Sequence, residues 1–186
     1  MIISETKIPG VLIIEPDVFP DKRGIFWETW RLQRYQEAGI SADFVQDNVS
    51  VSKKGTLRGL HYQHPHGQGK LVQVLSGSVF DVAVDIRLGS PTFGKSHSET
   101  LSDSNHKQLY IPPGFAHGFC VLSDTAIFSY KCTEYYDASA EAGVAWNDPD
   151  LKINWPIENP RLSNKDKAFS RLKDIKEDSL PHHEDK

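Results

Sequence analysis

Apolar and polar residues alternate with a period of two along most of the chain between Phe44 and Glu134. Such alternation places successive side chains on opposite faces of a strand, so it predicts sheets with one buried face. Turn-forming residues, mainly Gly, Pro, Ser and Asp, interrupt the pattern at short intervals. The strands that we predict here cover residues 44–52, 56–63, 70–75, 78–87, 96–101, 107–111, 115–122 and 125–134.

The segments on either side carry weaker patterns. On the N-terminal side we predict strands over 11–15 and 24–30, a loop over 16–24 and a short helix over 32–38. After Asp137 the alternation stops, and we expect a loop-like segment over 146–160 that packs across the sheets, a short helix over 163–172 and a flexible tail over 173–186. Many short strands with few peripheral helices are typical of a β-sandwich or barrel, so we predict one all-β domain over residues 1–186.

Composition narrows the class of protein. A chain of 186 residues can build one compact core. The formal net charge of -4 and the pI of about 6.0 argue against binding to nucleic acid or to an anionic membrane surface. No apolar run reaches membrane-spanning length, and the N-terminal residues lack the pattern of a secretion signal. We therefore expect a soluble cytoplasmic protein whose two cysteines, Cys120 and Cys132, are reduced and buried.

The stretch 57–63 is the first candidate for chemistry. Alternation places His61 on the same face as Leu57 and Gly59, inside a strand rather than a loop. A histidine on a rigid element is suited to general acid–base work near neutral pH. Proton abstraction also requires a positive charge, an acid and an orienting carboxylate. The respective candidates are Lys70 or Arg58, then Tyr130, and finally Asp81, Asp85 or Asp166.

A metal site is the competing hypothesis. His64, His66 and His117 resemble the metal-binding pattern of the cupin superfamily, whose fold is a jelly roll. That pattern requires an acidic ligand a few residues after the histidine pair, where this chain has Lys70 and Leu71. A protonated lysine repels a cation and has no lone pair to donate, so we expect no metal.

Each candidate also has a structural interpretation. A single strand histidine such as His61 is more often a hydrogen-bonded structural residue than a base, and Tyr130 alternates with apolar neighbours as a core residue does. Ser163 and Asp166 match a helix capping box, in which Asp166 binds a backbone amide. The residues alone therefore indicate a β protein with a histidine site and leave its reaction undecided.

Several ordered motifs extend this picture. Residues 21–28 read DKRGIFWE, which resembles the DxRGxFxE signature of the nucleotide-sugar 3,5-epimerases. Further blocks are similar to the same family: FVQDNVS at 44–50, RGLHYQ at 58–63, DVAVDIRLGSPTFG at 81–94, IPPGFAHGF at 111–119, and the segments 130–136, 146–149, 155–156 and 162–166. Because the blocks follow in order over most of the chain, the sequence resembles the dTDP-4-dehydrorhamnose 3,5-epimerase family.

The resemblance implies a cupin-type jelly-roll homodimer that acts without a metal or other cofactor. It implies inversion of C3 and C5 of dTDP-4-dehydro-6-deoxy-D-glucose, through enolates formed beside the 4-keto group, to give dTDP-4-dehydro-L-rhamnose. By the same resemblance, His61 is the base with Asp166 as its partner. Tyr130 is the acid, and Lys70 stabilises the enolate oxygen. The implied substrate-binding residues are Arg23, Glu28, Gln46, Asp47, Asn48, Arg58, Lys70, His117, Tyr136, Glu141 and Lys165, with Phe19 as a further contact.

Four other functions stay open at this stage. A mono-epimerase would invert only C3 or C5, with the same base and a different placement of the acid. A 3,4-ketoisomerase and a metal-dependent dioxygenase are alternatives on related β scaffolds. A non-catalytic sugar-nucleotide binder needs no acid–base pair, so the presence of both His61 and Tyr130 favours an enzyme.

Overall fold

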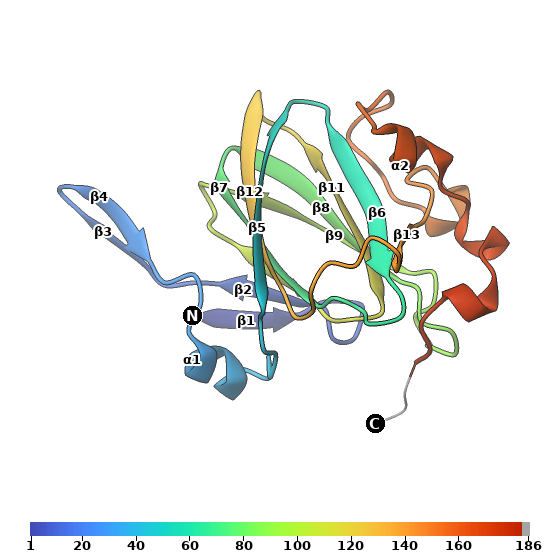
Figure 1. Ribbon diagram of the computed structural model, residues 1–186. Coiled ribbons are helices and arrows are strands. Elements are labelled where there is room, and N and C mark those ends of the chain that lie inside the picture. The colour runs from blue at the N-terminus through green and yellow to red at the C-terminus, as the bar shows by residue number, and fades with distance from the viewer. Residues whose placement is uncertain (184–186) are drawn as a thin grey trace.

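Two antiparallel sheets face each other in the computed structural model, which describes residues 1–183 (Figure 1). One sheet contains, in spatial order, β1 (Ile2–Glu5), β2 (Leu12–Glu15), β10 (Gln108–Ile111), β7 (Lys70–Ser76), β12 (Thr125–Cys132) and β5 (Gln46–Lys53). The other contains β13 (Glu141–Gly143), β6 (Leu57–Gln63), β11 (Phe115–Val121), β8 (Ser78–Asp85) and β9 (Ser96–Ser102). The prediction of an all-β jelly roll with few peripheral helices is confirmed.

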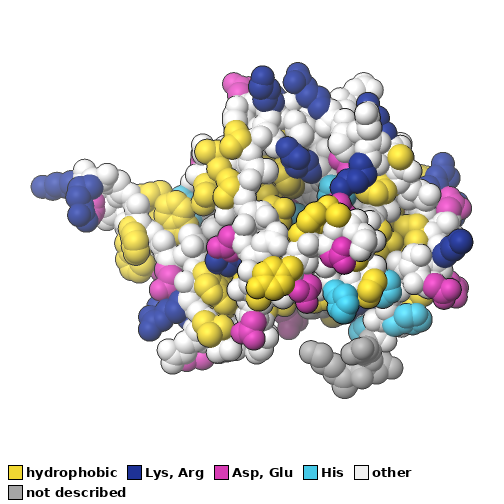
Figure 2. All heavy atoms as spheres, viewed as in Figure 1, with side chains coloured by type: hydrophobic (Ala, Val, Ile, Leu, Met, Phe, Trp, Pro, Cys, Tyr) yellow, Lys and Arg dark blue, Asp and Glu magenta, His cyan; other side chains and the backbone are white. Residues whose placement is uncertain are grey.

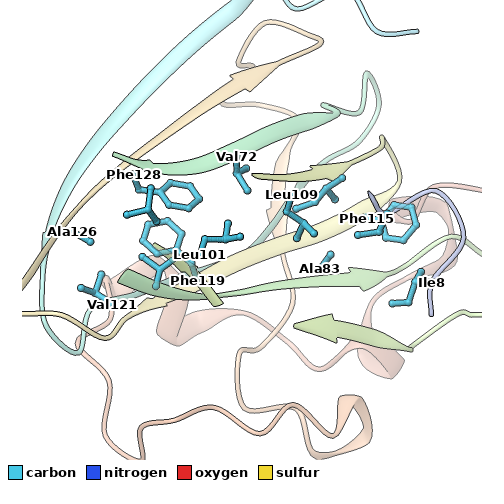
Figure 3. Packing of buried hydrophobic residues seen from close by; sticks show 14 residues of the cluster. Ile8, Val72, Ala83, Leu101, Leu109, Phe115, Phe119, Val121, Ala126 and Phe128 are labelled. Atoms are coloured by element: carbon cyan, nitrogen blue, oxygen red, sulfur yellow. The ribbon is translucent and has the colours of Figure 1, made fainter. Parts of the chain in front are cut away.

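The main hydrophobic core fills the space between the two sheets. In β8, Val79 and Ala83 point into this core, whereas Val82 and Val84 point to the opposite face of the same sheet. Figure 3 shows the core side chains of both sheets between the ribbons. Burial of these apolar groups holds the sheets together and leaves the polar side chains of the same inward faces to form a site at one end.

The C-terminal part of the chain covers the outer face of the five-stranded sheet (Figure 1). After β13 it runs through the 3-10 turn η1 (Pro149–Leu151), the helix α2 (Asn164–Ala168) and two further 3-10 turns, η2 (Leu172–Asp174) and η3 (Glu177–Ser179). Leu151 and Leu172 are buried against this face, and Trp155 packs beside them. The prediction that residues 146–160 pack across the sheets is therefore confirmed.

The segment predicted as a flexible tail, 173–186, is packed as far as the structure describes it. Leu180 is 2% exposed and belongs to the cluster on the outer face of the five-stranded sheet. The Leu88 amide donates to the Pro181 carbonyl at 2.8 Å, and the His183 amide donates to the Leu88 carbonyl at 2.9 Å. Two apolar residues in a polar segment, Leu180 and the partly buried Ile175, provide this anchor, which composition alone does not reveal. Residues 184–186 lie outside the described residues.

The N-terminal part differs most from the prediction. Strands β3 (Val18–Asp21) and β4 (Gly24–Trp27) form a hairpin that projects from the body, and the helix α1 (Leu32–Glu37) packs against the six-stranded sheet through Tyr35 (Figure 1). The loop predicted over 16–24 was therefore wrong, and the strand predicted over 24–30 was too long. Exposed Phe19, Ile25 and Phe26 explain this, because a hairpin without a buried face shows no alternation.

Three further elements differ from the prediction. The strands β1 and β13 were not predicted, since both are short and mostly unburied edge strands. The helix predicted over 163–172 ends at Ala168, because Phe169 already has an extended backbone.

Within residues 1–183, no helix has the length and apolar character needed to cross a membrane.

Candidate active site

The strands β6 and β11 bring two histidines opposite each other. His61 pairs in register with His117, and the register shifts between His117 and Phe119. Gly59 has a φ of +125°, and a Cβ atom there would lie 2.5 Å from the Cα of Gly118. Only glycine permits this backbone conformation and such a close approach of two strands. The local sequence thus places both histidines on the wall of one pocket.

A buried carboxylate from α2 holds His61. The Nε2 atom of His61 lies 2.6 Å from Oδ1 of Asp166, whose side chain is 4% exposed. Ser163 Oγ accepts a hydrogen bond from the backbone amide of Asp166 at 3.0 Å, so Ser163 caps the helix that begins at Asn164. The carboxylate of Asp166, predicted to bind a backbone amide in a capping box, instead faces the site and bonds His61. Burial raises the pKa of Asp166, but the hydrogen bond and charge of His61 outweigh it and hold this pKa below its usual range.

Phe169 supports the opposite side of the imidazole. Its ring meets the ring of His61 edge to face, with 5.7 Å between centroids. Gly143 on β13 pairs with His61 and leaves room for this contact, since a Cβ atom at Gly143 would lie 2.4 Å from the Phe169 ring. The unpredicted strand β13 therefore helps to orient the candidate base.

A second histidine–carboxylate pair lies deeper in the molecule. The Nε2 atom of His117 lies 2.9 and 3.0 Å from the two carboxylate oxygens of Asp81, and both side chains are buried. Asp85 instead binds the guanidinium of Arg87. Two of the three carboxylates considered as partners of His61 are therefore engaged elsewhere, and only Asp166 reaches it.

Lys70 and Tyr130 come from neighbouring strands of the other sheet, β7 and β12. In this pair Lys70 lies opposite Cys132, and Tyr130 lies opposite Val72. Burial lowers the pKa of the Lys70 ammonium and raises the pKa of the Tyr130 hydroxyl, because both charged forms lose hydration. A phenol is already protonated at neutral pH, and the raised pKa extends this to more alkaline pH, so Tyr130 is able to donate a proton.

These side chains surround one cavity of about 310 Å³. Figure 2 shows a hollow on the face of the molecule in view, with Lys and Arg side chains at its rim. The residues predicted for acid–base chemistry and sugar binding are gathered here, with Asp166 directly behind His61. The lining residues are Ser50, Arg58, His61, Lys70, His117, Phe119, Phe128, Tyr130, Tyr136, Glu141 and Lys165.

Glu141 joins two half-exposed residues at the rim of this pocket. Tyr136 donates its hydroxyl proton to Glu141 Oε2 at 2.7 Å, and Lys165 Nζ lies 2.6 Å from Glu141 Oε1. Burial raises the pKa of Glu141, but the hydrogen bonds from Lys165 and Tyr136 outweigh it and keep this pKa below its usual range. An anionic carboxylate therefore holds two hydrogen-bond donors beside the entrance.

Three of the predicted nucleotide contacts lie on the edge strand β5. Gln46 Nε2 donates to Asn48 Oδ1 at 3.1 Å, and Gln46 Oε1 accepts from the backbone amide of Tyr136 at 2.9 Å. Asp47 is exposed and binds Lys131 at 3.0 Å. Gln46 and Asn48 are thus linked to the rim of the pocket through Tyr136, whereas Asp47 is paired with a different residue.

Arg23, Glu28 and Phe19 lie away from the pocket of their own chain. Arg23 is at the tip of the projecting hairpin, where its side chain is 90% exposed and binds Asp21 (Figure 1). Glu28 lies 3.2 Å from Arg34 at the base of the hairpin. None of the three lines the cavity that contains His61.

Four residues of the site were missed from the sequence: Ser50, Phe119, Phe128 and Phe169. Phe119 follows His117 by two residues, and Phe128 precedes Tyr130 by two, so strand alternation contained a signal for both. Phe169 had no such signal, because its position depends on where α2 ends.

Within residues 1–183, no group of three His, Cys, Asp or Glu side chains is placed to hold a metal ion.

The fold and the pocket together define a class. A cupin-type jelly roll with a histidine–carboxylate pair, a buried lysine and a buried tyrosine around one cavity is equipped for acid–base chemistry on a polar ligand. Residues 5–174 match the family model described as dTDP-4-dehydrorhamnose 3,5-epimerase, and the chain belongs to that family.

Individual relatives agree with this assignment. The dTDP-4-dehydrorhamnose 3,5-epimerase of Shigella flexneri is 55% identical over 89% of this chain and 93% of its own length. The epimerase structure from Legionella pneumophila, in complex with dTDP-4-keto-L-rhamnose, has a TM-score of 0.96 and 52% identity and covers 98% of both chains. A 3'-monoepimerase from Streptomyces bikiniensis, in complex with dTDP-quinovose, has a TM-score of 0.89 and 35% identity over 95% of this chain and 91% of that chain.

Proposed function

We propose that this chain is an epimerase that inverts C3 and C5 of dTDP-4-dehydro-6-deoxy-D-glucose, giving dTDP-4-dehydro-L-rhamnose. The observation that carries the proposal is the pair of His61 and Asp166, which faces Tyr130 and Lys70 across one cavity. The 4-keto group of the substrate acidifies the hydrogens at C3 and C5. Removing either proton gives an enolate, and a proton returned to the opposite face of the ring inverts that carbon.

His61 acts as the base in this mechanism. Its Nε2 atom is bonded to Asp166, so Nδ1 is the ring nitrogen left for the substrate. The buried carboxylate orients the ring and stabilises the imidazolium that forms when the proton is taken. Phe169 restricts rotation of the imidazole, which keeps the base near a productive position.

Lys70 and Tyr130 complete the reaction from the opposite sheet. The Lys70 ammonium stabilises the enolate oxygen, and a charge in a buried site acts more strongly than the same charge in water. Tyr130 returns a proton to the carbon from the face opposite His61. Because this is proton transfer beside a ketone, the proposed mechanism uses no redox step and no cofactor.

The nucleotide is proposed to lie between two copies of the chain. Arg23 and Glu28 are far from the pocket of their own chain, and the hairpin that carries Arg23 exposes Phe19, Ile25 and Phe26. An exposed apolar group of this kind is typical of an interface. We therefore propose a homodimer in which the hairpin of one copy reaches the nucleotide at the pocket of the other. Arg23 would then bind the diphosphate through its planar fork.

Cytoplasmic location is also a proposal. Cys120 and Cys132 are both free and buried, which suits a reducing compartment. The proposed substrate is a nucleotide sugar, a metabolite of the cell interior.

The decisive experiment is proton NMR of dTDP-4-dehydro-6-deoxy-D-glucose incubated with the protein in deuterated water. We expect deuterium at both C3 and C5 and formation of the L-sugar, and His61→Ala should bind dTDP while losing exchange at both carbons. Exchange at one carbon only would define a mono-epimerase, an alternative supported by the similarity to the Streptomyces bikiniensis enzyme. No exchange at either carbon would overturn the proposal for this substrate.

A further inference from the structure

Lys70 carries its charge in the pocket wall, and no carboxylate among residues 1–183 is bonded directly to it. Burial lowers the pKa of this ammonium, and the charges around it only partly restore it. The groups that face it come from both sheets and from α2. They are Cys132 and Tyr130 from β12, Asp81 from β8, Glu141 from β13, Arg58 and His61 from β6, His117 from β11, Tyr136 from the loop after β12, and Lys165 from α2.

Cys132 has the most direct position relative to this lysine. It is the cross-strand partner of Lys70 on one side and of Gln46 on the other, and it is fully buried. Directly opposed residues in an antiparallel pair point to the same face, with Cβ atoms roughly 5 Å apart. Alternation also places Cys132 on the same face of β12 as Tyr130, which lines the pocket.

The sulfur of Cys132 is tied to the strand that carries the nucleotide candidates. Asn48 Nδ2 donates to Cys132 Sγ at 3.6 Å, and Asn48 Oδ1 accepts from Gln46 Nε2. Gln46 in turn accepts from the backbone amide of Tyr136 at the rim. A continuous chain of polar contacts therefore leads from the rim of the pocket to the sulfur beside Lys70.

We propose that Cys132 is a positioning residue for Lys70: its sulfur, held by Asn48, supports the ammonium of Lys70 inside the pocket and couples it to β5. A polarisable sulfur provides lone pairs where the wall offers the ammonium no bonded carboxylate. The role of Lys70 at the enolate oxygen rests on the proposed function. The pairing of sulfur and ammonium does not, so it can be tested on the protein alone.

The first test is carbon-13 NMR of the protein labelled at its cysteines, titrated toward high pH. The chain has two cysteines, so Cys120, which lies on β11 and pairs with Leu57 and Phe80 instead of Lys70, serves as an internal control. In Lys70→Met the thiolate loses its positive neighbour, and we expect the Cys132 signal to titrate at higher pH while the Cys120 signal is unchanged. Equal midpoints for Cys132 in both proteins would overturn the proposal, even if the wild-type protein had no activity on the proposed substrate.

The second test is the pH dependence of turnover in Cys132→Val, Cys132→Ser and the control Cys120→Val. Valine removes the lone pairs, so Lys70 loses its proton at lower pH, and the alkaline limb should move down by about half a unit. Serine keeps an acceptor and should restore the limb, while Cys120→Val should leave it in place. If Cys132→Val does not fold, Cys132→Ala replaces it. The proposal would be contradicted if Cys132→Val or Cys132→Ala folds and the alkaline limb of its pH–turnover profile stays where it is in the wild-type protein.

Discussion

At the scale of single residues, the base is defined by its carboxylate. His61 and His117 each have a buried carboxylate partner, but the side chain of His61 is 27% exposed at the pocket whereas that of His117 is 8% exposed, so His61, held by Asp166 at 2.6 Å, is the one open to a substrate. Asp166→Asn keeps the shape of the side chain and removes this charge. We expect proton exchange at C3 and C5 to slow by about 10²–10⁴-fold, with dTDP still bound. Deuterium incorporation and calorimetry measure the two effects, with Asp150→Asn as the control. An unchanged exchange rate would refute the partnership.

The same carboxylate makes stability depend on pH. Since the pKa of Asp166 is lower in the folded protein than the usual 3.8, its charge stabilises the fold above that pH. This contribution is lost as the pH falls through the folded-state pKa. Urea denaturation should therefore show a larger advantage of wild type over Asp166→Asn at neutral pH than at about pH 3. An advantage that did not shrink on acidification would be inconsistent with the lowered pKa.

The acid is tested by Tyr130→Phe. The phenylalanine keeps the ring that packs against Phe128, with 5.9 Å between centroids, and loses the proton donor. We expect deuterium exchange to continue while inversion falls by about 10²-fold, because His61 returns the proton to the face from which it came. NMR gives the ratio of exchanged to inverted sugar, and the exposed Tyr135→Phe is the matched control. Normal inversion in Tyr130→Phe would mean that another group is the acid.

At the scale of elements, the strands that bury one face in the core are the ones that the sequence predicts well. The strands β6, β7 and β12 have one face in the core, and alternation located each to within two residues. Strand β3 has no buried residue and β13 is only three residues long, and neither was predicted, whereas β4 was predicted but extended too far. Residue patterns left the carboxylate partner of His61 open, because Asp81, Asp85 and Asp166 are distinguished only by strand register and by the placement of α2, and it was the family resemblance that indicated Asp166.

The contribution of strand β13 to the site can be tested at Gly143, which lies against Phe169. A Cβ atom at Gly143 would lie 2.4 Å from the Phe169 ring, so Gly143→Ala must displace the ring that supports His61. We expect a loss of about 1–3 kcal/mol in the free energy of unfolding and a lower turnover rate. Phe169→Leu should relieve the clash, so the double variant should be more stable than the sum of the two single changes predicts. Strictly additive effects, measured by denaturation, would rule out this contact as the cause.

At the scale of the whole molecule, the pocket of a single chain brings together the residues assigned to proton transfer but not all those assigned to the nucleotide. Resemblance grouped Arg23 and Glu28 with His61, and the structure separates them. Sequence motifs report which residues act together without stating on which copy they lie. The hairpin that carries Arg23 projects from the body of the chain, and in the proposed homodimer it would reach the pocket of the second copy (Figure 1).

Mixed dimers decide whether Arg23 acts across the interface. Two differently tagged chains, Arg23→Ala and His61→Ala, are co-expressed and the mixed dimer is purified through both tags. If Arg23 serves the partner's pocket, one of the two sites combines a native His61 with a native Arg23, and activity should rise above both parents toward about half of wild type. The control dimer pairs His61→Ala with Tyr130→Phe; both residues line the same pocket, so each site keeps one defect and no recovery is expected. Failure of the first pair to recover would place Arg23 outside the partner's site.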